Sequence, residues 1–157
     1  MQPFVHLHVH SQYSVLDGQA SVKALVDKAI ANGMRGIALT DHGNMFGIKE
    51  LTDYVNKKNK DVDGEIKNLK KTIEELKSAD AVDQEALSKA ETALKEAESK
   101  IFTPIIGCEM YVADNDMTDR SNKKDIGRHL IVLAKNQHGY HNLIKLVSNA
   151  WTDGYYY

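Results

Sequence analysis

"GIALT" (residues 36–40) decides the fold that this sequence predicts, because it is a short apolar run of strand length between two helical patterns. Before it, Ser21 is a candidate helix cap, and apolar residues then recur at helical spacing up to Gly33: Val22, Leu25, Val26, Ala29 and Ile30. After it, we expect a second helix to begin near Asn44 and to bury Ile48, Leu51, Thr52 and Val55. A buried strand between helices is typical of an α/β protein.

Three further segments have the pattern of strands. Residues 4–10 alternate in polarity, which predicts a strand that carries His6, His8 and His10 on one face. "TPIIGCEMYV" (103–112) and "HLIVLA" (129–134) are apolar runs of strand length, and a last helix is expected to bury Tyr140, Leu143, Ile144 and Val147. Because strands alternate with helices, we expect parallel strands joined by right-handed crossovers.

Residues 61–101 differ from the rest of the chain. They hold seven Lys and eleven Asp or Glu, so they carry a charge of −4, whereas thirteen basic and eleven acidic residues give the remainder +2. Apolar residues here follow two coiled-coil seams, separated by the polar stretch "SADAVD" (78–83), in which Asp80 or Asp83 can cap a helix. This pattern predicts an antiparallel helical hairpin; the alternatives are a solvated hairpin that packs only on itself and an arm that docks a partner.

Composition limits the class of protein. The 157 residues are 42% hydrophobic and 27% charged, as in a globular domain, and no apolar run approaches the length of a membrane span. The chain is too short for a typical eight-unit barrel. One cysteine, Cys108, excludes an intramolecular disulfide and agrees with a cytoplasmic setting. A small hydrophobic role is expected for it, on the strand face opposite Glu109.

Potential metal ligands gather at the expected strand ends. Side chains two apart on a strand point the same way, so His8 and His10 can hold one ion. Asp41 and His42 follow the strand at 36–40, and Glu109 lies near the end of the strand at 103–112, where the sites of α/β proteins gather. The remaining candidates are Asp17, in the loop after residues 4–10, and His129, which stands at the start of its strand and fits the rule less well. Imidazole and carboxylate ligands suit zinc, manganese or iron.

Four motifs, taken together, resemble a known family. "FVHLHVHSQYSVLDG" (4–18), "ALTDHGNMFG" (38–47), "PIIGCEMYVA" (104–113) and "HLIVLAKNQHGYHNLIKLVSNA" (129–150) are similar to the polymerase and histidinol phosphatase (PHP) domain at the N-terminus of bacterial DNA polymerase III alpha subunits. The resemblance implies a distorted barrel of seven β/α units with up to three metal ions. It implies that His8 and His10 hold one ion, that Glu109 bridges it to a second held by His129, and that Asp17 and His42 hold a third. Asp41 then either orients a metal-bound imidazole or caps the following helix, and His6 is a supporting or core residue.

The resemblance also implies functions. Some members of the family have a metal-dependent 3′–5′ exonuclease activity, and others keep the domain as a scaffold for the polymerase and its proofreading exonuclease. It therefore implies DNA and replisome subunits as partners and a cytoplasmic replication protein. The alternatives are a stand-alone phosphoesterase acting on a small phosphate monoester, such as histidinol phosphate, and a non-catalytic module of replisome assembly.

The chain also departs from the family pattern. Only about four of the seven β/α units are present, and further ligands of the family lie beyond the equivalent of Tyr157. We therefore expect an incomplete barrel made of residues 1–60 and 102–157, with 61–101 as an inserted helical hairpin. As part of a DNA-directed DNA polymerase, the isolated piece is expected to bind metal incompletely and to have weak nuclease activity or none.

Overall fold

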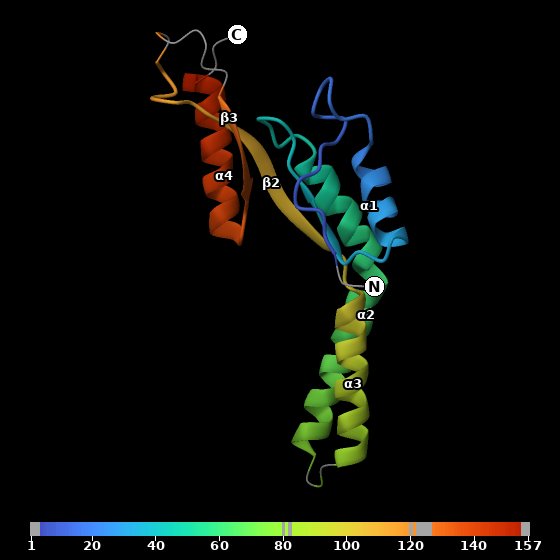
Figure 1. The fold of residues 1–157 in the computed structure, drawn as a ribbon. Coiled ribbons are helices and arrows are strands. Elements are labelled where there is room, and N and C mark those ends of the chain that lie inside the picture. Colours follow the sequence, from blue (N-terminus) through green and yellow to red (C-terminus); the bar gives the residue numbers. More distant parts are fainter. Residues whose placement is uncertain (1–3, 80, 82, 120, 122–126, 155–157) are drawn as a thin grey trace.

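The computed structural model describes residues 4–79, 81, 83–119, 121 and 127–154. Within that part of the chain the fold is mixed α/β (Figure 1). Its elements are α1 (Val22–Ala31), β1 (Gly36–Leu39), α2 (Ile48–Ser78), α3 (Gln84–Lys100), β2 (Thr103–Val112), β3 (Arg128–Leu133), α4 (Gln137–Asn149) and the short π-helix η1 (Ala150–Gly154). None of the described helices is both long enough and apolar enough to cross a bilayer.

The three strands form one sheet in the order β1-β2-β3. β1 and β2 are parallel, as expected, with Gly36 opposite Thr103 and Leu39 opposite Ile106. β2 and β3 are antiparallel, so the expectation of parallel strands throughout is wrong at β3. A parallel pair needs a crossover, usually a helix, and the described part of the connection from β2 to β3 contains turns but no helix.

The N-terminal segment is not the strand that its alternating pattern predicted. Residues 4–10 bend at Leu7 and His8 and carry no strand assignment, although the segment lies along β1. Ala38 N–H donates to the His6 carbonyl at 2.9 Å, and Thr40 N–H donates to the Val9 carbonyl at 2.9 Å. The Thr40 hydroxyl also accepts from Val9 N–H at 2.9 Å. The bend interrupts the ladder, and these bonds still hold the histidine-bearing segment beside β1.

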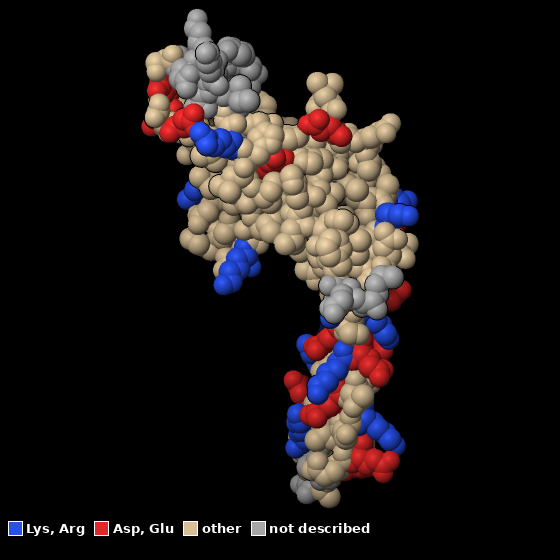
Figure 2. Space-filling view, in the orientation of Figure 1, with Lys and Arg blue, Asp and Glu red and all other residues tan. Residues whose placement is uncertain are grey.

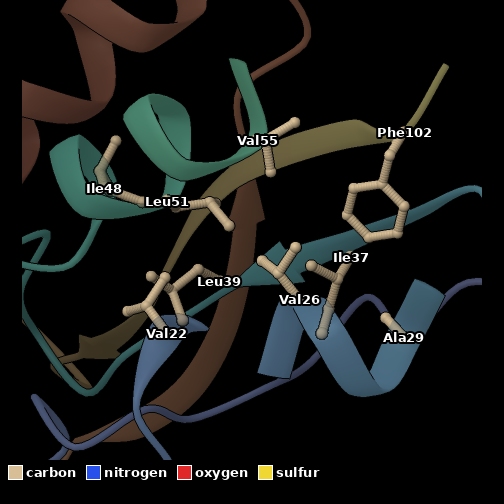
Figure 3. Packing of buried hydrophobic residues seen from close by; sticks show 9 residues of the cluster. All are labelled: Val22, Val26, Ala29, Ile37, Leu39, Ile48, Leu51, Val55 and Phe102. Atoms are coloured by element: carbon tan, nitrogen blue, oxygen red, sulfur yellow. The ribbon is translucent and has the colours of Figure 1, made fainter. Parts of the chain in front are cut away.

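The core lies between α1, β1 and the first turns of α2 (Figure 3). Its buried members come from each of these elements and from the residue before β2: Val22, Val26, Ala29, Ile37, Leu39, Ile48, Leu51, Val55 and Phe102. α1 begins as predicted, because the Ser21 hydroxyl accepts from Ala24 N–H, and it ends before Gly33, whose φ of 73° suits glycine. The expected burial of Ile30 and Ile144 is wrong, since each is 39% exposed.

α2 is longer than any single helix that the sequence predicted. It begins at Ile48 rather than near Asn44 and continues past residue 60 to Ser78 without interruption. α3 begins after Asp83, whose carboxylate accepts from Glu85 N–H and Ala86 N–H. Beyond the body, α2 and α3 lie side by side and project together, and charged side chains cover them (Figures 1 and 2). Below, "the arm" means residues 61–101, and "the body" means the rest of the described chain.

Ion pairs give the direction of the two helices in the arm. Three pairs join α2 to α3: Lys70 to Glu98, Lys77 to Glu91, and Lys100 to Glu65. Residues late in α2 thus pair with residues early in α3, so the helices run in opposite directions. The seam residues between them are at least partly shielded from solvent, and Ile73 and Ala97 are buried.

Candidate metal centre

Glu109 is the centre of the candidate site. It belongs to β2, one position beyond the buried Cys108, and its side chain is 3% exposed. β1 has already ended at this level: His42 forms an isolated parallel bridge with Glu109, and Glu109 N–H donates to the Asp41 carbonyl at 3.1 Å. The carboxylate therefore lies at the carboxyl edge of β1, where a parallel sheet gathers functional side chains.

Four histidines surround the Glu109 carboxylate. Its Oε2 lies 3.2 Å from His8 Nε2, 2.9 Å from His10 Nε2 and 3.2 Å from His42 Nδ1, and its Oε1 lies 2.6 Å from His129 Nδ1. His8 Nε2 and His10 Nε2 are themselves 2.9 Å apart. These atoms form two groups with the spacing of metal ligands, His8 with His10 and Glu109, and His42 with Glu109 and His129, so the carboxylate is common to both.

The antiparallel direction of β3 explains the position of His129. In the register of β2 and β3, His129 stands opposite Tyr111, near the carboxyl end of β2. The start of an antiparallel strand lies beside the end of its neighbour, so a residue at the start of β3 reaches the same rim as Glu109. The misfit noted in the sequence came from assuming a parallel strand.

Asp17 reaches the cluster through His42. Its Oδ2 lies 2.7 Å from His42 Nε2, while the Asp17 side chain remains 63% exposed. Turn hydrogen bonds build the loop that carries it, with Asp17 N–H and Gly18 N–H both donating to the Ser14 carbonyl. Gly18 is needed there because a Cβ would stand 1.8 Å from the Ser11 carbonyl oxygen. His42 thus contacts both Glu109 and Asp17, which differs from a strict pairing of His42 with Asp17 alone.

The electrostatics of the cluster favour a cation. Burial raises the pKa of Glu109, but the hydrogen bond from His8 and the charges of His42, His129 and His10 outweigh burial and lower it overall. Burial, then the charge of His42, lowers the pKa of His10 below its ordinary value of 6.5. Imidazole nitrogens and a shielded carboxylate gathered within a few ångströms are ligand types that divalent metal ions take, so the donor set fits a divalent metal ion.

Asp41 makes no direct contact with an imidazole in the described hydrogen bonds. It is 1% exposed, and its carboxylate accepts from Ser11 N–H at 2.6 Å, Ser11 Oγ–H at 2.8 Å and Ser14 Oγ–H at 2.7 Å. Ser14 Oγ in turn lies 2.9 Å from His10 Nδ1. The two serines were not among the predicted site residues, because their contacts with Asp41 join positions 30 and 27 residues apart in the chain.

Other residues near the cluster have clear positions. The Tyr111 hydroxyl lies 3.1 Å from His42 Nδ1. Tyr111 was not among the predicted site residues, although it stands two residues after Glu109, on the same strand face. Cys108 is buried, and burial raises the pKa of its thiol to about 11, in agreement with the expected small hydrophobic role. His6 is exposed and packs edge-on against Phe4, so its interpretation as a core residue is wrong.

Comparisons with known proteins show the family to which the chain belongs. The family model of the PHP domain matches residues 6–157. DNA polymerase III subunit alpha of Treponema pallidum is 41% identical over 157 residues, and its counterparts in Borreliella burgdorferi and Chlamydia trachomatis are 37% and 33% identical over 159 and 156 residues. Each match covers 98% of this chain but only 10%, 10% and 9% of the respective relative, so the chain spans about a tenth of their length.

Proposed function

Because the chain belongs to the PHP domain family, we propose that it is the N-terminal PHP segment of a bacterial replicative DNA polymerase III alpha subunit, with metal-dependent phosphoester hydrolysis at the Glu109 cluster. The parent protein is then a DNA-directed DNA polymerase, and its partners are DNA and replisome subunits such as the proofreading exonuclease. The reaction assigned to the cluster is removal of nucleotides from DNA 3′ ends. The observation that carries this proposal is the convergence of four imidazoles on one buried carboxylate.

The proposed ligands are His8, His10, Asp17, His42, Glu109 and His129, and the short distances among their side chains support this choice. His8 and His10 would hold a first ion together with Glu109, His129 would hold a second beside the same carboxylate, and Asp17 and His42 would hold a third. When bound, such ions supply Lewis acidity and charge neutralisation for hydrolysis of a phosphodiester. The shielded Glu109 fixes the negative charge that draws cations to this point, and the Tyr111 hydroxyl offers a donor at the edge of the cluster.

The arm is proposed to be a separate module inserted into the partial barrel formed by residues 1–60 and 102–157. Two features support this. Its seam residues pack between α2 and α3, and Asn59 closes its base, donating to the Phe102 carbonyl at 2.8 Å and accepting from Phe102 N–H at 3.1 Å. The body therefore retains its own closure at Asn59 and Phe102 when the arm is disregarded.

Metal content and activity test the proposal. In the full-length protein that carries this segment, we expect about three divalent ions per chain by mass spectrometry, with hydrolysis of a 3′-labelled DNA strand that Glu109→Gln abolishes. In the isolated 157-residue chain we expect fewer than three tight zinc sites by calorimetry and little hydrolysis. Three tight sites on the isolated chain would contradict the incomplete site. A metal-free full-length protein that binds replication partners tightly would replace the hydrolytic function by an assembly role.

A further inference from the structure

Ser14 joins the metal-ligand cluster to a buried carboxylate behind it. Its side chain is fully buried, and its Oγ lies 2.9 Å from His10 Nδ1, 2.7 Å from Asp41 Oδ1 and 3.1 Å from the main-chain nitrogen of His42. The opposite ring nitrogen of His10, Nε2, is the atom that faces Glu109 and His8. One buried hydroxyl therefore contacts the side of His10 that faces away from the cluster.

The direction of each hydrogen bond follows from the count of hydrogens. A serine hydroxyl has one hydrogen to donate, and an ionised carboxylate can only accept. Ser14 therefore donates to Asp41 Oδ1, and its oxygen accepts from His42 N–H and from His10. If His10 is neutral, its one hydrogen on Nδ1 serves the contact with Ser14, and its Nε2 then faces Glu109 Oε2 at 2.9 Å with a lone pair, a contact between two acceptors that a bound cation would relieve. That lone pair is directed at the position between Glu109 and His8.

We infer that Ser14 is a positioning residue, which holds His10 in the Nδ1–H tautomer so that its Nε2 lone pair is ready for a cation. The inference deepens the proposed function and rests on it, since it concerns the same ligand group. A ligating imidazole whose second nitrogen donates to a fixed acceptor has its tautomer and ring orientation set before the ion arrives. Here that acceptor is the hydroxyl of Ser14.

Asp41 fixes the orientation of Ser14. Its carboxylate takes the Ser14 hydrogen and is held from the other side by Ser11, through N–H at 2.6 Å and Oγ–H at 2.8 Å. Asp41, Ser11 and Ser14 are all at most 1% exposed, so water does not compete for these bonds. Asp41 therefore acts on His10 through Ser14, at one remove.

The two serines provide a matched pair of variants. Ser14→Ala removes the acceptor of His10 Nδ1–H, whereas Ser11→Ala removes an equally buried hydroxyl donor to Asp41 that does not touch His10. Long-range ¹H–¹⁵N NMR of the metal-free 157-residue chain at about pH 8, above the ordinary histidine pKa, reads the tautomer of His10. Competition between the chain and a chelator for Zn²⁺ reads the affinity.

We expect the unsubstituted chain and Ser11→Ala to show the Nδ1–H form of His10, and Ser14→Ala to lose it. Zinc affinity should fall about 10- to 100-fold in Ser14→Ala, as for loss of an outer partner of a metal ligand, and clearly less in Ser11→Ala. The inference is overturned if His10 of the unsubstituted chain is in the Nε2–H form, a measurement that needs no variant, or if both substitutions weaken zinc equally. A chain with the Nδ1–H form whose full-length counterpart binds no zinc would contradict the proposed function and keep the tautomer assignment.

Discussion

The carboxylate of Glu91 in the arm lies 2.9 Å from the ammonium group of Lys77, and about half of each side chain faces water, with exposures of 46% and 55%. The carboxylate of Glu109 in the body is 3% exposed and lies within 3.2 Å of four imidazole nitrogens. Water and salt screen the first arrangement strongly and the second weakly. The same functional group therefore forms a surface ion pair in one region and is the centre of the proposed cation site in the other.

Glu109→Gln should have the largest effect, because it removes the carboxylate charge that the two ligand groups of the described residues have in common. We expect zinc affinity to fall by more than about 100-fold, because loss of a residue that only hydrogen-bonds a metal ligand already costs up to about 100-fold. Calorimetric titration with Zn²⁺ measures the change. Glu91→Gln in the arm is the matched control and should leave zinc affinity unaltered; equal losses in both variants would mean that zinc binds through general surface charge.

Removing a large side chain from the body should lower stability more than the same removal in the arm. Leu51 is 1% exposed and belongs to the core cluster, so Leu51→Ala should cost about 2–5 kcal/mol in the free energy of unfolding. Leu69 belongs to the seam that Ile66, Leu69, Ile73 and Leu76 form on α2, and it is only partly buried, so Leu69→Ala should cost clearly less. Urea unfolding followed by circular dichroism compares them, and a larger loss at Leu69 would contradict this ranking.

Replacing residues 61–101 by a short Gly/Ser linker should leave the body folded with unchanged zinc stoichiometry. The reason is the closure of the body by Asn59, which pairs with both main-chain groups of Phe102. Adding Asn59→Ala to this variant should lower the free energy of unfolding by about a further 1–3 kcal/mol, because the buried main-chain groups of Phe102 lose their partner. Loss of cooperative unfolding in the linker variant itself would show that the body depends on the arm.

The sequence predicted best where a local rule decided the structure. The cap at Ser21, the stop at Gly33, the buried strand at β1 and the span of β2 follow from patterns within a few residues. The predicted ligands also meet, because strand ends place Glu109 and His42 at one rim regardless of the later topology. Local pattern and strand polarity were sufficient for these features.

The rest depended on pairing partners that the sequence does not show. Nothing local distinguishes β3 as antiparallel, and the alternation of residues 4–10 did not predict the bend at Leu7 and His8. Ser14 was not predicted because its role depends on its contacts with Asp41, 27 residues away, and with the imidazole of His10. Tertiary hydrogen bonds determine these features, and the helical and strand periods of the sequence do not predict such bonds.

The Lys77–Glu91 pair should contribute little to stability. For exposed pairs of this kind, a double-mutant cycle gives about 0.2–1 kcal/mol, and we expect a value in that range from Lys77→Ala, Glu91→Ala and the double variant. Screening should reduce it towards zero in about 1 M salt, where the Debye length is near 3 Å. A coupling energy that persists in high salt would indicate a shielded pair, closer in kind to the Glu109 cluster.

Asp27 is more exposed than Glu109, but it has two hydrogen-bond donors, Lys58 and Tyr54. Its substitution should have the smallest effect on the free energy of unfolding. Asp27 joins α1 to α2 by accepting from Lys58 and Tyr54, and these hydrogen bonds lower the pKa of Asp27 below 3.8. A carboxyl group with a lowered pKa stabilises the fold above its unfolded pKa, and this contribution is lost as the pH falls through the folded value. The gap in unfolding free energy between the unsubstituted chain and Asp27→Asn should therefore narrow as acid is added from neutral pH to below the folded pKa. Urea unfolding midpoints of both chains, measured at a series of acid pH values, give this difference. A difference that widens in acid would mean that folding raises the pKa of Asp27, so that its ionised form does not stabilise the fold.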